Sequence, residues 1–163
     1  MLVLQLVLFC LLFALLVKCL ARDSGQNCMY FYSQEYLDEA VKRGIVADKD
    51  ALMKKGKRLM IPFCLIMLVA LLLIVGVWNR VTDFWTAYFQ VVLFLVVMNW
   101  FDGICIDRIW VGHSKLWKIK GMEGVPYLKP WKTVFTKRGL GTVAYFVIAF
   151  PVAWAVTAIA GLL

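Results

Sequence analysis

The sequence contains few of the residues that bind metals and prosthetic groups. It has one histidine, His113, and its five cysteines include no Cys-x-x-Cys pair. A single histidine excludes a haem held between two histidines of one chain. A quinone-linked disulfide-forming membrane enzyme needs paired cysteines outside the cell, and the topology derived below places none there. We therefore predict no metal site, and the sequence identifies no cofactor.

Charge is nearly missing from four long stretches of the chain. Residues 2–21, 60–78, 84–104 and 140–163 are almost wholly apolar, and each has about the 20 residues that let a helix cross a bilayer. Hydrophobic residues make up 63% of the chain, more than a soluble fold of this length can bury. These stretches predict an all-α, polytopic membrane protein: a four-transmembrane-helix bundle, with residues 1–163 as a single membrane domain.

The positive charges fall in two of the three connections, which predicts the orientation. Residues 22–58 and 105–138 carry eight Lys and Arg each, whereas 79–83 carries only Arg80. Basic residues near span ends stay on the cytoplasmic side. We expect cytoplasmic loops at 22–58 and 105–138, an external turn at 79–83, and both termini outside. The first stretch is expected to be an uncleaved span, because its cations follow the apolar run, unlike those of a signal peptide.

The first loop has the pattern of a cytoplasmic helical hairpin. Ser33 is a predicted N-cap for a helix over 34–43, Gly44 ends that helix, and Asp48 caps a second helix that leads into the second span. Cys28 precedes the hairpin, in a compartment where thiols stay reduced. The first helix carries a narrow apolar stripe made of Tyr36, Leu37, Ala40 and Val41. The stripe either lies against the membrane or against the loop over residues 105–138, or docks a cytosolic protein partner.

The third apolar stretch ends in a group of polar residues. Acidic residues at the end of an apolar helix are costly to bury and are functional candidates, so Asp102, Asp107 and His113 are candidate acid–base groups. At 100° per residue, Asn99, Asp102 and His113 fall within about 60° of one another, whereas Asp107 points about 140° away from Asp102. The alternative is a hydrogen-bonded, salt-bridged end of the bundle with a structural role.

Lys18 is the expected partner of Asp102. The two residues reach a similar depth when each is counted from the start of its span. A structural ion pair there avoids an uncompensated charge in a low-dielectric medium. The alternative is that Lys18 extends its ammonium group to the lipid headgroups.

The second loop is basic and aromatic. Residues 113–138 carry seven Lys and Arg against one acid, Glu123, with aromatic residues interleaved. This composition beside a membrane favours binding to anionic membrane lipids, and no nucleic acid is expected because a span at each end holds the loop against the bilayer. The lysines predicted to bind lipid are Lys115, Lys118, Lys120, Lys129 and Lys132.

Small residues recur every four positions in the fourth stretch, at Ala149, Ala153, Thr157 and Gly161. Such stripes let helix backbones approach closely in a membrane. This stripe either packs within the bundle or joins subunits of a homo-oligomer.

The stretch from Asn99 to Lys115, followed by Ile119-Lys-Gly-Met-Glu-Gly, resembles a family of small four-span bacterial membrane proteins with no established activity. The likeness extends to residues 34–58. It implies the four-span topology and a bacterial plasma membrane, and it transfers no catalytic residue. The span order also resembles that of the membrane glutathione-transferase and eicosanoid superfamily, whose arginine-rich signature is not recognisable here; this is an architectural analogy.

Three functions fit these features. The first is a non-enzymatic membrane protein that binds lipid or a partner through its loops. The second is a membrane-embedded enzyme acting on a lipid or isoprenoid-phosphate headgroup, with Asp102, Asp107 and His113 as its acid–base groups. The third is a small proton-coupled transporter, disfavoured because few polar residues lie near the middle of the spans.

Overall fold

The computed structural model describes residues 1–21 and 31–162, and among these residues it contains helices and no strand. Cys28 and the rest of residues 22–30 lie outside the described part, as does residue 163. Four helices are long and apolar enough to cross a membrane. They are α1 (Leu2–Leu20); α3 (Lys49–Leu72), continued by η3 (Leu73–Trp78); α4 (Phe84–Phe101), continued by η4 (Asp102–Trp110) and α5 (Val111–His113); and α6 (Trp131–Gly161). The prediction of an all-α chain with four such helices is confirmed.

Three of the long helices extend beyond the predicted spans. The second begins at Lys49, the third continues to His113, and the fourth begins at Trp131. Hydropathy marks only the part of a helix that contacts hydrocarbon, whereas backbone hydrogen bonding continues into polar flanks until a cap or turn ends it. The apolar runs therefore give the approximate position of each helix and not its ends.

The predicted caps are present. Ser33 accepts a hydrogen bond from the backbone N–H of Tyr36 at the start of α2 (Gln34–Lys42), and Asp48 accepts two at the start of α3. Gly44 follows α2 with a φ of 71°, the left-handed conformation that glycine adopts without strain. Lys49 and Asp38 form an ion pair between α3 and α2. These local signals fix where the chain turns between the two helices.

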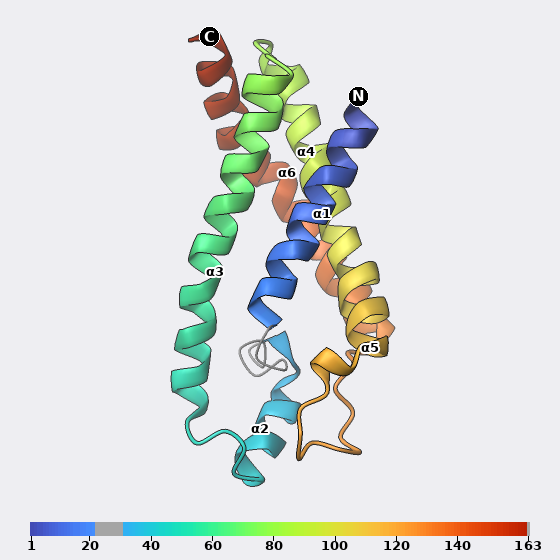
Figure 1. Ribbon diagram of the computed structural model, residues 1–163. Helices are drawn as coiled ribbons and strands as arrows, with labels where there is room; N and C mark the ends of the chain where they lie inside the picture. The colour runs from blue at the N-terminus through green and yellow to red at the C-terminus, as the bar shows by residue number, and fades with distance from the viewer. Residues whose placement is uncertain (22–30, 163) are drawn as a thin grey trace.

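The two chain ends and residues 79–83 lie at one end of the bundle, and α2 and residues 114–130 lie at the other (Figure 1). We call the second of these the loop end. Helix α4 packs most extensively against α6, and Ala149 and Ala153 of α6 are fully buried. Thr157 is half-buried and Gly161 is exposed, so the small-residue stripe packs within the bundle over its first half.

A second core lies at the loop end. Tyr36, Leu37 and Ala40 of α2 are buried together with Trp117 and other residues of the 114–130 segment. Arg43 Nη1 also donates a 2.9 Å hydrogen bond to the carbonyl oxygen of Gly121. Most of the apolar stripe of α2 is thus covered by the chain's own second loop, and only its last member, Val41, is exposed.

Candidate functional site

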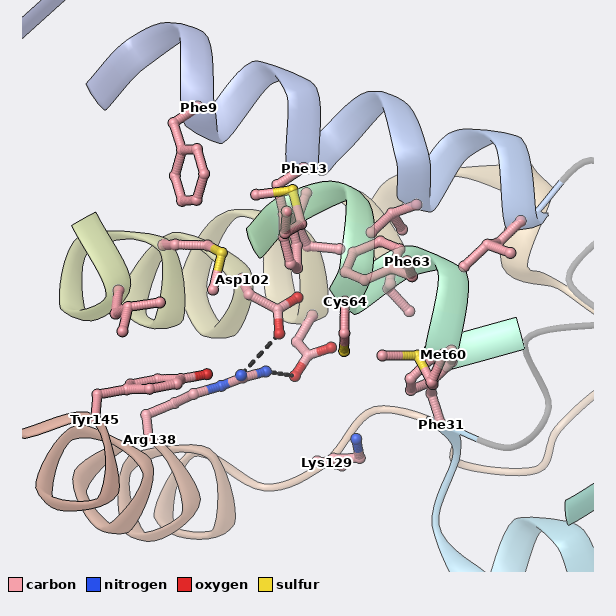
Figure 2. Close-up of a pocket in the computed structure, with 18 of the residues that line it drawn as sticks. Phe9, Phe13, Phe31, Met60, Phe63, Cys64, Asp102, Lys129, Arg138 and Tyr145 are labelled. Carbon is pink, nitrogen blue, oxygen red and sulfur yellow. Dashed lines mark hydrogen bonds and ion pairs between the residues drawn. The ribbon is translucent and has the colours of Figure 1, made fainter. Parts of the chain in front are cut away.

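A π-helical segment brings Asp102 and Asp107 together. In η4 the hydrogen bonds join residues five apart, so side chains five apart lie on one side of the helix. Asp102 Oδ2 lies 2.7 Å from Arg138 Nη1, and Asp107 Oδ2 lies 2.7 Å from Arg138 Nη2 (Figure 2). The prediction that Asp107 points away from Asp102 is wrong, because it assumed 100° per residue throughout the helix.

Arg138 of α6, and not Lys18, is the partner of Asp102. Lys18 is exposed near the end of α1, whereas α4 and η4 pack against α6. Gly103 permits this approach, since a Cβ atom at that position would lie 2.8 Å from Cγ and Nε of Arg138. The predicted pairing of Lys18 with Asp102 is therefore wrong. It was based on the similar positions of the two residues along their helices, and such positions do not show which helices are neighbours.

Asn99 fixes the first turns of α6 beside the ion pairs. Its Nδ2 donates a 2.8 Å hydrogen bond to the carbonyl oxygen of Arg138 and a 3.2 Å bond to Thr142 Oγ1. Arg138 Nη1 in turn lies 3.4 Å from Asn99 Oδ1. Because Asn99 is 4% exposed, these bonds satisfy a polar group that would otherwise be costly to bury. The side-chain fork of Arg138 is consequently held in one place.

The ion pairs border a cavity of about 560 Å³ between the helices (Figure 2). Its walls come from α1, α3, α4, η4 and α6, and from residues of the two loops. Most of the lining side chains are apolar, among them Phe9, Phe13, Phe63, Leu71, Leu95 and Val152. The charged lining residues are Asp102, Asp107, Lys129 and Arg138. The cavity is therefore apolar along the long helices and charged at its loop end.

Lys129 supplies a second cation to this charged end. Figure 2 shows its side chain directed into the cavity, and within residues 1–21 and 31–162 its ammonium group forms no ion pair. Burial lowers the pKa of Lys129, and the nearby carboxylate of Asp107 offsets part of that effect. Arg108 Nη1 donates a 2.7 Å hydrogen bond to the Lys129 carbonyl oxygen, which fixes the backbone there.

The other predicted site residues lie away from the cavity lining. His113 is exposed, and its Nδ1 lies 2.8 Å from the carbonyl oxygen of Ile109. The remaining predicted lipid-binding lysines, Lys115, Lys118, Lys120 and Lys132, are exposed on the loop end. The structure thus brings together two of the three acid–base candidates and one of the five lysines. In the described part of the chain, no three His, Cys, Asp or Glu side chains gather as a metal site requires.

Sequence reasoning missed Arg138 and the apolar walls. Arg138 was counted only as one of many basic residues of the second loop, because the predicted fourth span began at residue 140, whereas α6 begins at Trp131. A buried donor was also missed: the indole N–H of Trp117, a lining residue, has no hydrogen-bond partner among the described residues.

Comparison of the chain with protein-family models, with curated proteins and with solved structures found no match. The site is therefore interpreted from its own chemistry. Two carboxylates, one guanidinium and one ammonium give the charged end a formal charge of zero. A long apolar wall with a compact polar end fits an amphiphile, because each part of such a molecule meets an environment of its own polarity.

Proposed function

We propose that the protein is an integral membrane protein that binds one membrane lipid inside its helix bundle, with the acyl chain along the apolar walls and the headgroup at the charged end. The observation that carries this proposal is the amphiphilic cavity of about 560 Å³, a volume typical of small-molecule sites. In this role the protein holds the lipid without transforming it.

The dimensions of the cavity fit one leaflet of a bilayer. The lining residues of α1 run from Phe9 to Leu20, about 17 Å along a helix axis. One leaflet contributes about 15 Å of hydrocarbon. Asp102 lies about 27 Å along the helix from Phe84, so in the proposed orientation the ion pairs would lie near the inner boundary of the hydrocarbon. A lipid of the cytoplasmic leaflet would then have its headgroup at the charged end.

The proposed orientation puts the loop end in the cytoplasm and both termini outside, in a bacterial plasma membrane. The basic residues of α2, the start of α3 and residues 114–130 support this orientation. The exposed Lys115, Lys118, Lys120 and Lys132 would contact anionic headgroups around the bundle, at about 1 kcal/mol per cation.

This orientation predicts the outcome of cysteine labelling. Single cysteines at the exposed positions 42, 82 and 120, introduced after removal of the native cysteines, would be tested with a membrane-impermeant thiol reagent on intact cells. We expect labelling at position 82 alone, and labelling of all three after the cells are lysed. Labelling of position 120 in intact cells would contradict the four-span orientation.

Lipid binding inside the bundle is tested by filling the cavity. Leu68 of α3 lines the cavity, whereas Leu65, nearby on the same helix, does not and is 58% exposed. We expect Leu68→Trp to retain about tenfold less lipid than the parent, the equivalent of about 1.4 kcal/mol of binding. Leu65→Trp should retain the parental amount. Native mass spectrometry of gently extracted protein measures both.

The same spectra distinguish binding from catalysis. A membrane-embedded enzyme acting on the headgroup is a second candidate, because η4 places two carboxylates on the cavity and π-helical segments are frequent at functional sites. A chemically unchanged lipid after prolonged incubation supports a binding protein, whereas a cleaved or modified headgroup supports an enzyme. Equal retention by Leu68→Trp and Leu65→Trp would place the lipid outside the bundle and contradict the proposal.

A further inference from the structure

The charged end of the cavity also indicates which headgroup it accepts. We infer that the bound lipid is a zwitterionic phospholipid whose headgroup carries a primary amine, that is, a phosphoethanolamine lipid. This inference rests on the proposed function, because it assumes that a lipid occupies the cavity. The inference is based on the hydrogen-bond acceptors and donors at the charged end that take no part in the two ion pairs.

The two carboxylates offer acceptors for an ammonium group. Arg138 binds one oxygen of each, Oδ2 of Asp102 and Oδ2 of Asp107. Within the described part of the chain, the other oxygen of each carboxylate has no hydrogen-bond or ion-pair partner. The side chains of both aspartates remain about one quarter exposed, at 23% and 24%, and both line the cavity. A primary ammonium group has three N–H donors and can bind both free oxygens.

Lys129 offers a donor for a phosphate group. Its ammonium group enters the same cavity without an ion-pair partner among the described residues. Isolating a cation in a partly buried site is unfavourable, and a phosphate oxygen would relieve that cost through a charge-assisted hydrogen bond. Phosphate and amine are neighbours in a phosphoethanolamine headgroup, and Lys129 and Asp107 line the same cavity and interact electrostatically.

The balance of charge argues against two other common headgroups. A phosphoglycerol headgroup brings a phosphate and no cation, so it would satisfy Lys129 but leave two carboxylates facing an added negative charge. A phosphocholine headgroup carries a positive charge but no N–H group, so it cannot donate to the free oxygens of Asp102 and Asp107. Of these three headgroups, phosphoethanolamine alone carries both the phosphate and the primary amine that match the donors and acceptors of this site.

The experiment compares three synthetic lipids that share the same acyl chains and carry phosphoethanolamine, phosphocholine or phosphoglycerol headgroups. Each is titrated into delipidated protein in detergent, and dissociation constants are measured by native mass spectrometry. We expect phosphoethanolamine lipid to bind about tenfold more tightly than either of the others, as two hydrogen bonds to charged groups allow. Equal or tighter binding of either competitor would overturn the inference.

Two variants show whether the preference arises at the charged end. Asp107→Asn leaves the ion pair between Arg138 and Asp102 in place and gives the site a net positive charge, so the preference should move to the phosphoglycerol lipid. Lys129→Gln removes a cation that has no ion-pair partner in the described structure, and should weaken binding of all three lipids about tenfold. Lys42→Gln, at an exposed lysine of α2 that does not line the cavity, is the control and should leave the three constants unchanged.

The results separate this inference from the proposed function. A lipid that is retained, and is lost on Leu68→Trp, but shows no headgroup preference overturns the inference alone. If none of the three lipids binds, both proposals fail. If Lys42→Gln weakens binding as much as Lys129→Gln, the measured lipid lies on the surface of the protein, and the assignment of the headgroup to the cavity is wrong.

Discussion

Replacing Arg138 with methionine should lower the free energy of unfolding by about 3 kcal/mol, a typical cost of removing one partner from a partly buried ion pair. The guanidinium group of Arg138 is bound by two carboxylates, and its side chain is 19% exposed. Without it, Asp102 and Asp107 would face each other as two unpaired negative charges beside a mainly apolar cavity. Tryptophan fluorescence during unfolding of the detergent-solubilised protein measures the loss.

A neighbouring cation provides the control. Lys137 precedes Arg138 on α6 and is exposed, so Lys137→Met should change the stability by less than about 0.5 kcal/mol. Replacing Asp102 and Asp107 with asparagine in the Arg138→Met background should recover much of the lost stability, because the unpaired charges are then absent. If Arg138→Met unfolds as Lys137→Met does, the ion pairs contribute nothing to the bundle.

Ala153→Leu should destabilise the protein by about 1–3 kcal/mol, the usual cost of adding methylene groups to a well-packed core. Ala153 is fully buried on α6, the helix that packs most extensively on α4. A leucine side chain there would force the two backbones apart. The melting temperature in detergent should fall by several degrees.

Ala158→Leu is the matched control for this variant. Ala158 lies on the exposed side of the same helix, so the added methylene groups would contact lipid or detergent and cost little. If Ala153→Leu melts at the same temperature as the parent protein, the bundle can accommodate a larger side chain at this position. The small residues would then not determine how closely α4 and α6 pack.

The sequence predicted the fold through features that act locally. The four apolar runs identified the long helices because crossing a membrane requires a minimum length of apolar helix. Ser33, Gly44 and Asp48 identified the boundaries at the loop end because capping depends on residues within one turn. The continuation of α4 through η4 and α5 to His113 and the start of α6 at Trp131 were missed, because polar residues can extend a helix beyond its apolar part.

The candidate site was predicted only in part. Asp102 and Asp107 were identified because acidic residues are rare at the end of an apolar helix. His113 was grouped with Asp102 by its helical angle, and five lysines were predicted to bind lipid from the composition of the loop. The structure places His113 and four of these lysines outside the cavity lining. Composition shows which charges lie near one end of the bundle, but it does not show on which face of each helix they lie.

Helical character, approximate span positions and the separation of charge between the two ends follow from the sequence itself, because each depends on residues close together in the chain. The tertiary structure alone decided that Asp102 pairs with Arg138 rather than Lys18, since that choice depends on which helices pack together. It also decided that Asp107 joins them, because a π-helical segment changes which side chains share a face. The cavity is likewise a property of the packed bundle: its walls come from all four long helices, whose relative rotation depends on interhelical contacts that no single stretch of sequence encodes.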